Sequence, residues 1–375
     1  MAISSSLTDQ AVGLDASGPA TAGPDRFYRL RRTTEALLVP IIALCLAAFA
    51  FSIFLLFLGK SPDVFFELVW RGAFGSSFSF QNALERASPL LLTALCVALP
   101  ARLGLVIIGG EGAVVLGGLA AAAIALPIGE MPAPVVQMAM ALAAMFVGGA
   151  WMALAGWLRA VRGINETITS LLLAYIALAI FNHLVEGPLR DPASLNKPST
   201  AAIGDANMLG HLPGTDLHAG LAIGVIACIA LWILIERTSF GFACRVTGGN
   251  IRAAQLQGLP VVRLMLIACA LGGACAGIAG MVEVAAIHGR ANASLAAGYG
   301  YAGILISFLA RHNPLAIIPM AVLVGGISAS GGLVQRRLGL PDATVLVLQG
   351  MIFLSILTSE TIYGRFRWFQ PRETT

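Results

Sequence analysis

Charged side chains are scarce in this chain of 375 residues. Asp, Glu, Lys and Arg account for 11% of it, whereas soluble domains carry about 25%. Hydrophobic residues make up 58%, which excludes an ordinary soluble domain and predicts a polytopic membrane protein. The formal net charge of +4 is small, so nucleic acid is not an expected partner.

Paired cysteines and the common catalytic motifs are also missing. The six cysteines form no C-x-x-C pair, so neither a disulfide framework nor a zinc site is indicated. No G-x-x-x-x-G-K-[S/T] phosphate loop, H-E-x-x-H or G-x-S-x-G motif is present. We therefore expect no enzyme activity and no bound cofactor, and any ATP that drives this protein would be hydrolysed by a separate subunit.

Ten apolar runs are long enough to be interpreted as membrane crossings of about 20 residues each. They span residues 36–59, 87–108, 112–128, 131–158, 167–185, 217–235, 264–282, 296–310, 314–334 and 343–358. The predicted fold is an all-α membrane protein with about ten transmembrane helices. The membrane domain would cover residues 36–358.

Both ends of the chain are predicted to be cytoplasmic tails. Residues 1–35 begin with a stretch rich in Ser, Ala, Gly, Thr and Pro and are expected to be disordered. Residues 359–375 would form the second tail. Arginines flank the first and last predicted spans, and an even number of crossings places both ends on the side that positive charge favours. The chain would then be a multi-pass membrane protein with both termini in the cytoplasm.

A polar segment at residues 236–263 carries several arginines between two apolar runs, which predicts a cytoplasmic position. Asn250 is a good N-cap for a short helix over residues 251–256, Gly258 is suited to end it, and Pro260 prevents its continuation. A short helix with small residues and shaped ends favours docking into another protein over a solvated connector. The residues assigned to this role are Gly241, Arg245, Gly248, Asn250, Ala253, Ala254 and Gly258.

Six polar residues in or beside the predicted spans are candidates for a translocation path. A carboxylate inside a membrane is costly unless it is paired or wet, so Glu111 is a functional candidate with Arg102 as its nearby partner. The alternative is an acid that the macrodipole favours at a helix start. Helix capping is likewise the alternative for the group that begins the fifth span. For Asn182 the alternative is an interfacial position, and for Gln349 it is a helix–helix hydrogen bond. The six candidates are Glu111, Asn165, Glu166, Thr169, Asn182 and Gln349.

Three further patterns concern packing and symmetry. Small residues four apart, such as Gly273 and Gly277, predict a face for close helix packing. Residues 298–303 are rich in glycine and could introduce a broken or re-entrant helix. Residues 161–167 and 337–344 share a basic residue, a glycine, an aliphatic residue, a helix-starting residue and an acid. This match indicates inverted repeats, which are common in transporters, and chance similarity is the alternative.

The polar segment resembles the cytoplasmic coupling loop of ABC-importer permeases of the ribose, branched-chain amino acid and nucleoside type. The shared pattern is T-x-x-G-x-x-x-R-x-x-G-x-N-x-x-A-A-x-x-x-G, which starts at Thr238. Elements of the nucleoside type are similar to residues 108–112, 163–169, 186–192 and 298–304. The similarity covers about residues 85–358. In that family the short helix sits in a cleft of the ATPase, so Ala253 and Ala254 would face that subunit.

The resemblance implies an all-helical permease of the vitamin B12-importer-like kind. It also implies a second, related permease chain, two ATPase subunits and an extracytoplasmic lipoprotein that captures a small-molecule substrate. A path that is polar but nearly uncharged favours nucleosides, because a charged substrate would call for a compensating charge at mid-membrane. The alternatives are a permease of the same type for a sugar or amino acid, or an ion-coupled secondary transporter that uses Glu111 and Glu166.

Overall fold

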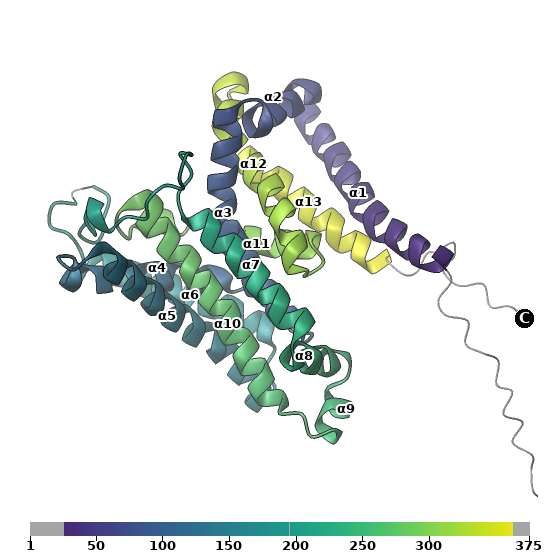
Figure 1. Cartoon of the computed structure of the whole chain (residues 1–375). Helices are drawn as coiled ribbons and strands as arrows, with labels where there is room; N and C mark the ends of the chain where they lie inside the picture. The colour runs from purple at the N-terminus through teal and green to yellow at the C-terminus, as the bar shows by residue number, and fades with distance from the viewer. Residues whose placement is uncertain (1–25, 195, 363–375) are drawn as a thin grey trace, which may run out of the picture.

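A computed structural model describes residues 26–194 and 196–362, and within these ranges it contains thirteen α-helices and no named strand. Figure 1 shows their arrangement. The helices are α1 (Arg26–Phe57), α2 (Pro62–Phe74), α3 (Ser77–Ala101), α4 (Gly110–Ile128), α5 (Ala133–Arg162), α6 (Glu166–Glu186), α7 (Gly220–Arg237), α8 (Ser239–Gly249), α9 (Ile251–Leu256), α10 (Val261–Val282), α11 (Tyr299–Leu309), α12 (Pro314–Leu338) and α13 (Ala343–Ile362). A π-helical turn (Glu283–His288) extends α10, and 3-10 turns occur at Asp205–Asn207 and Ala293–Leu295.

Seven helices of the described chain are long and apolar enough to cross a membrane, and an eighth span results if α1 and α2 are counted as one broken span. The seven are α3, α4, α5, α6, α7, α10 and α12. Every predicted run contains a helix, but the expected ten crossings are wrong. Helix α11 has 11 residues, which at 1.5 Å per residue reach about half of a hydrocarbon core. The apolar part of α13, Ala343–Ser359, is also too short to qualify.

Helices of the described chain extend into both predicted tails. Helix α1 begins at Arg26, inside the predicted N-terminal tail, and α13 continues through Ile362. The remaining tail residues, 1–25 and 363–375, lie outside the described chain. The vitamin B12-importer-like arrangement stays a prediction.

Helix α10 lies at the centre of the bundle and packs against α3, α4 and α5 through backbone-to-backbone contact. A Cβ on Gly148 of α5 would lie 2.5 Å from the carbonyl oxygen of Gly273, and one on Gly272 would lie 2.8 Å from that of Cys96 in α3. Gly277 is equally close to α5. The predicted small-residue face is therefore confirmed, and it is used on more than one side of the helix.

Helices α1, α2 and α13 form a second group beside this bundle (Figure 1). Helix α1 makes its main helix contact with α13. The bend of 119° between α1 and α2 is fixed from the side, because the Lys60 ammonium donates a hydrogen bond to the Leu338 carbonyl at the end of α12. Phe51 and Phe65 pack against each other across the bend, with their ring centroids 4.9 Å apart and their planes tilted by 50°.

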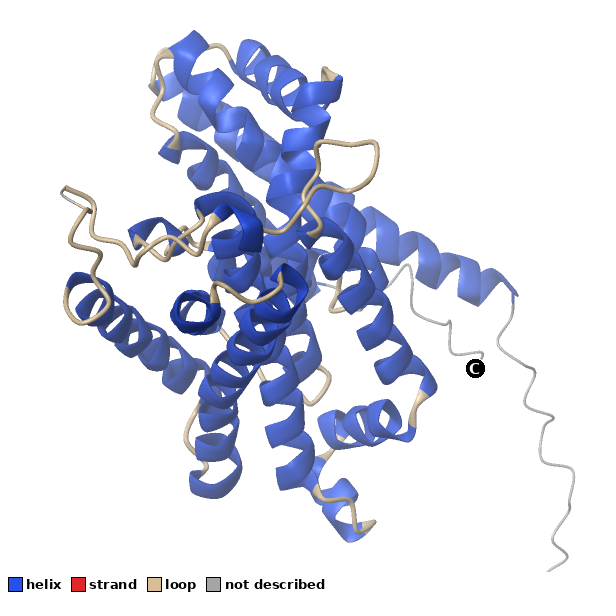
Figure 2. Cartoon of the chain, turned by 60° about the vertical axis from the view of Figure 1, so that its left-hand side comes forward, coloured by secondary structure: helices blue, strands red, loops and turns tan. Residues whose placement is uncertain are grey.

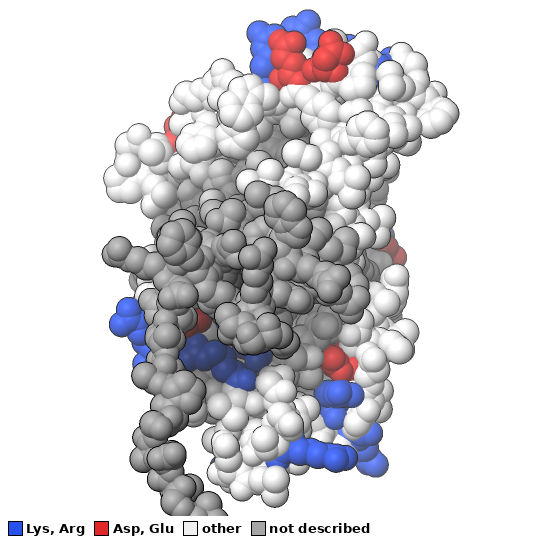
Figure 3. All heavy atoms as spheres, turned by 90° about the vertical axis from the view of Figure 1, so that its right-hand side faces the viewer, with Lys and Arg blue, Asp and Glu red and all other residues white. Residues whose placement is uncertain are grey.

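The two ends of the molecule differ in structure. Helices α8 and α9 project at one end, whereas α2 and the long connection between α6 and α7 lie at the other (Figures 1 and 2). On the face shown in Figure 3, charged residues gather toward the two ends, and the described surface between them is mostly uncharged. This distribution suits a protein that crosses a hydrocarbon layer between its two ends.

The two junctions that suggested a repeat share one backbone conformation. Gly163 ends α5 with φ 67° and ψ 14°, and Gly339 ends α12 with φ 66° and ψ 16°. The first junction follows the part of α5 that packs on the α9-proximal half of α10, through Gly156 and Cys269. The second lies beside Lys60 at the α1–α2 bend. The junctions therefore lie toward opposite ends of the molecule, as inverted repeats require, and the repeat itself stays a prediction.

Candidate functional site

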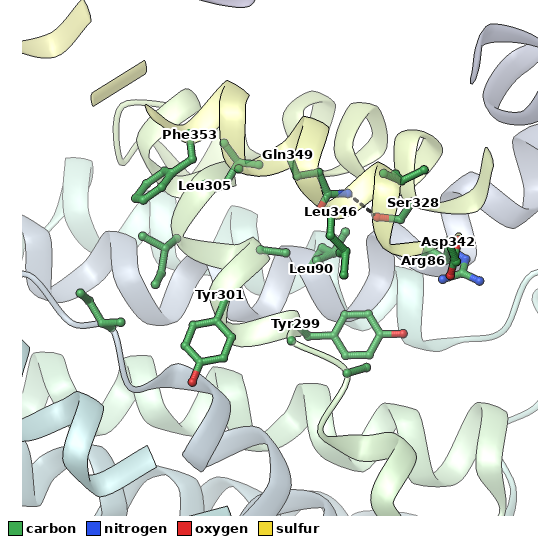
Figure 4. Close-up of a pocket in the computed structure, with 17 residues that line it drawn as sticks. Arg86, Leu90, Tyr299, Tyr301, Leu305, Ser328, Asp342, Leu346, Gln349 and Phe353 are labelled. Atoms are coloured by element: carbon green, nitrogen blue, oxygen red, sulfur yellow. Dashed lines mark hydrogen bonds between the residues drawn. The ribbon is translucent and has the colours of Figure 1, made fainter. Parts of the chain in front are cut away.

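A cavity of about 630 Å³ lies between α3, α11, α12 and α13 and is shown in Figure 4. Its aromatic part consists of Tyr299 and Tyr301 at the start of α11 and Phe353 on α13. This volume falls within the range of about 300–1,000 Å³ typical of small-molecule sites, which combine apolar walls with a few polar groups.

The polar groups of the cavity are few and balanced in charge. The Gln349 amide on α13 donates a hydrogen bond of 2.8 Å to the Ser328 hydroxyl on α12 (Figure 4). Arg86 and Asp342 supply one formal charge of each sign to the lining. Aromatic faces, an amide, a hydroxyl and balanced charges together suit a neutral solute that has both a flat ring and hydrogen-bonding groups.

Glu111 lies behind the wall that Tyr299 and Tyr301 form. Its side chain is 1% exposed, and its two carboxylate oxygens accept hydrogen bonds from the backbone N–H groups of Gly298 (2.8 Å) and Gly300 (2.6 Å). The acid therefore caps α11, a helix almost two hundred positions later in the chain. Of the two alternatives predicted for Glu111, the acid at a helix start is correct, because Glu111 lies in the first turn of α4. The sequence did not indicate that Glu111 also caps α11.

The expected pairing of Glu111 with Arg102 is wrong. Arg102 ends α3, where its guanidinium donates to the His312 carbonyl (3.1 Å) and lies 3.7 Å from the Glu236 carboxylate. The two residues are only nine positions apart in the sequence, but the non-helical segment that follows α3 separates them.

The polar group that begins α6 caps that helix and holds the connection between α3 and α4. Asn165 accepts from the first N–H groups of α6, and Thr169 donates to the Asn165 carbonyl (2.8 Å). Glu166 lies 3.3 Å from the Arg159 guanidinium and accepts from the Val106 N–H (3.4 Å). The capping alternative is therefore the arrangement that the structure contains.

The predicted path residues do not come together in one place. Asn182 lies exposed on α6, and the α6 group lies away from the cavity lining. Glu111 approaches the cavity through Gly298, which lines it. Gln349 is the one of the six that the described cavity lining includes.

The segment expected to couple to another protein folds as two short helices, α8 and α9. Helix α9 begins after Asn250, whose side chain accepts from the Ala253 N–H (3.0 Å), and Gly258 follows it with φ 78°. Both capping predictions are confirmed. Ala254, however, is fully buried against the chain itself, whereas Leu256 is 90% exposed. The expectation that Ala254 faces a partner is wrong, because α9 turns that side toward its own core.

A chain of charges connects this segment to the ends of three other helices. Arg245 on α8 donates to the Glu236 carboxylate (2.8 Å) and to the Ile235 carbonyl (3.2 Å) at the end of α7. Glu236 in turn faces Arg102 of α3. Burial, and then the neighbouring Arg102, lowers the pKa of His312 to about 4 in the loop between α11 and α12. Helix α8 is thus tied to the loop that ends the cavity helix α11.

Glycines in the coupling segment permit this close approach. Gly241 lies directly against the Ile235 carbonyl, and Gly248 lies against the Arg102 carbonyl, so neither position has room for a Cβ. The sequence marked both glycines through the family pattern, and the structure supplies the physical reason for each of them.

Comparison with known proteins places this architecture in a family. Residues 79–357 match the family of branched-chain amino acid transport system permease components. A glucose ABC transporter permease protein of Haloferax volcanii is 33% identical over 351 residues, covering 90% of this chain and 92% of the relative. A guanosine ABC transporter permease protein of Bacillus subtilis is 28% identical, covering 87% and 94%.

The chain belongs to this ABC permease family.

The predicted resemblance is therefore confirmed, and the permease is a multi-pass membrane protein. A nucleoside ABC transporter permease protein of Lactococcus lactis is also similar, at 26% identity over 87% of this chain and 92% of the relative. The names of these relatives thus include both a sugar and nucleosides.

Several residues of the cavity escaped the sequence reasoning. Arg86 lies one position before the second predicted run, and Asp342 lies one position before the last. Neither residue lies inside a predicted run, so neither is among the six candidates for the translocation path. Tyr299 and Tyr301 lie in the predicted glycine-rich break, and two aromatic rings beside a broken helix are a usable signal for a ligand wall.

Proposed function

We propose that this permease is the membrane subunit of an ATP-driven importer and moves nucleosides through the cavity between α11 and α13. The observation that carries the proposal is the lining: two tyrosines, a glutamine amide, a serine hydroxyl and one charge of each sign. A nucleoside offers a base that stacks on such rings and a ribose that forms hydrogen bonds with such groups. The guanosine and nucleoside permeases among the relatives support the same class.

A hexose is the second candidate substrate. The permease shares 33% identity with a glucose permease over nearly the full length of both chains. Sugars also bind to aromatic faces and amide groups, so the lining suits them too. The nucleoside is preferred because two aromatic rings favour a ligand that has a flat ring of its own.

The partners follow from the family, whose transport requires an ATPase and a substrate-binding protein. We propose a separate ATPase subunit that hydrolyses ATP, a second, related permease chain and an extracytoplasmic lipoprotein. This chain itself binds no cofactor and catalyses no reaction. The importer would lie in the inner membrane of a bacterial cell.

The ATPase would dock on the exposed side of α9. Leu256 is the most exposed large apolar residue of the segment, and Ile251 and Arg252 are exposed on the same short helix. An apolar side chain held out from a rigid helix suits insertion into a groove of a partner. Leu256 therefore replaces Ala254 as the proposed contact.

The α8–α9 end would face the cytoplasm, together with both termini. The first residues of α1 lie beside the last described residues of α13, and α1 runs from there to α2 at the opposite end from α9 (Figures 1 and 2). This arrangement supports placing both ends of the chain on the side of the ATPase.

Uptake measurements test the substrate and the energy source. Cells that carry the permease with its partner subunits should accumulate radiolabelled adenosine and guanosine, and an excess of glucose should not compete. Glucose uptake without competition by nucleosides would select the hexose. Accumulation that survives ATP depletion and follows the proton gradient would defeat the ATP-driven reading.

Two variant pairs test the assigned residues in the same cells. Tyr301→Leu removes a stacking surface and should raise the KM for adenosine by roughly fivefold or more, since stacking of a base on an aromatic side chain is worth about 1–3 kcal/mol. Tyr301→Phe keeps the ring and should stay near wild type. Leu256→Asp should abolish uptake without reducing membrane insertion, whereas Leu256→Met should transport normally.

A further inference from the structure

The cavity contains a feature that normally attracts anions. Helix α11 begins at the wall of the cavity. The residues from the start of this helix that line the cavity are Gly298, Tyr299, Tyr301 and Ala302. The first turn of a helix has N–H groups without intrahelical partners and a positive end of the macrodipole. Broken helices in transporters commonly direct such N-termini at anionic groups of the substrate. A cavity built on α11 would therefore be expected to bind carboxylates or phosphates.

In this chain the anion position is already filled from within. The carboxylate of Glu111 accepts from Gly298 N–H at 2.8 Å and from Gly300 N–H at 2.6 Å. Glu111 also lies in the first turn of α4, so one negative charge serves the N-termini of two helices. The helices meet closely, because a Cβ on Gly110 would lie 3.7 Å from the Gly300 Cα.

Within the described chain, Glu111 forms no ion pair with a cationic side chain. Glu166 is paired with Arg159, and Glu236 is paired with Arg245 and Arg102. The charge of Glu111 is therefore balanced by the two helix ends rather than by an arginine. Any anion that entered the cavity would meet a helix end that is already neutralised and a carboxylate directly behind it.

We propose that Glu111 is a specificity-determining residue that makes the cavity select neutral solutes over anionic ones. This inference rests on the proposed function, in which the cavity holds the substrate during transport. Nucleosides and sugars satisfy the condition, whereas nucleotides and sugar phosphates do not. Solutes with a free carboxylate, amino acids included, cannot bind through the N-terminus of α11, because Glu111 already occupies it.

The test measures the electrostatics of the cavity without relying on its substrate. Ala297 lines the cavity next to Gly298 and is exposed, so Ala297→Cys places a thiol beside the capped helix end once the native cysteines are replaced. The full-length chain in lipid nanodiscs is treated with an anionic methanethiosulfonate, the sulfonatoethyl reagent, and with a cationic one, the trimethylammonium reagent. The readout is the ratio of the anionic to the cationic reaction rate.

We expect Glu111→Gln to raise this ratio at least about threefold, because the helix ends then lose their neutralising charge. Glu111→Asp retains the charge and should keep the ratio near that of the parent. Glu166→Gln is the matched control, since it removes a membrane acid that lies away from the cavity lining. An unchanged ratio in a folded Glu111→Gln protein overturns the proposal.

A second comparison needs no Glu111 variant. Ala193→Cys places a thiol in the exposed connection between α6 and α7. The ratio of the anionic to the cationic reaction rate should be lower for the thiol at position 297 than for the thiol at position 193. Equal ratios overturn the proposal even if Glu111→Gln fails to fold. The substrate assignment is tested separately by adenosine, which should slow the labelling of position 297. Failure of adenosine to protect would count against the proposed function and leave the charge ratio as the measure of Glu111.

Discussion

Replacing Gly148 by alanine should separate α5 from α10, which pack backbone against backbone. A Cβ at this position of α5 would lie 2.5 Å from the Gly273 carbonyl oxygen and 2.9 Å from the Gly277 Cα in α10. Real Cβ contacts are not found below 3.0 Å, and both obstructing atoms belong to the backbone. The helices must therefore move apart by at least about 0.5 Å, because neither neighbour can rotate away. Overpacking of this kind costs about 1–3 kcal/mol, and every 1.4 kcal/mol lowers the folding equilibrium constant about tenfold.

The effect can be measured by titrating the purified permease with SDS and following the loss of helical circular dichroism. Gly332→Ala in α12 is the matched control, because a Cβ there meets only the end of the Arg336 side chain at 3.4 Å. Alanine is favoured over glycine in a helix interior by about 1 kcal/mol, so the control should unfold no earlier than the parent. If Gly148→Ala unfolds at the same SDS fraction as Gly332→Ala, the account of the α5–α10 contact is refuted.

Three further outcomes are expected. Ala254→Trp should lower the folded yield of the chain itself, because Ala254 is fully buried; a well-folded variant that only fails to engage the ATPase would restore the docking role of that residue. The pKa of His312 is lowered from 6.5 to about 4, so the unfolded chain takes up a proton before the folded chain does and stability should decrease as the pH falls from 6.5 toward 4. His312→Asn should flatten that dependence in SDS titrations run at pH 7.5 and pH 5. In a background without native cysteines, a thiol at position 193 should react with an impermeant reagent added outside intact cells, whereas one at Gln255 should not. The reverse pattern would invert the proposed orientation.

Helices that depend on local signals could be predicted from the sequence, and α9 is the clearest case. Asn250 and Gly258 fix its two ends through short-range hydrogen bonding and backbone conformation, and the structure has the predicted bounds. The length of α11 could not be predicted in the same way. Residues 296–310 are as apolar as a full span, but the helix starts only after Gly298 and ends before Arg311 and His312, which have positive φ values of 52° and 56°. Composition identifies the apolar run but does not indicate the turns inside it.

Little of the candidate site could be predicted, because its residues come from helices far apart in the sequence. Gln349 lines the cavity and also donates to Ser328 on a neighbouring helix, and Glu111 is a candidate because a buried acid needs a partner. Its partners are backbone N–H groups of residues 298 and 300, which no side-chain pattern can reveal. Ala254 illustrates the converse, since its small size suits a buried helix face as well as a docking surface, and only tertiary packing decides between them.

The pairing of α1 with α13 also sets the order in which the protein can be completed in the cell. Phe51 and Leu55 are fully buried in the described chain, and the main helix contact of α1 is with α13, which is translated almost three hundred residues later. At about 5–20 residues per second, the ribosome needs on the order of 15–60 s to travel from the end of α1 to the start of α13. During that interval the inner face of α1 is shielded only by lipid, by α2 or by a membrane chaperone. A chain released early would therefore lack both one wall of its cavity and the partner of its first helix, which would mark it for quality-control proteolysis.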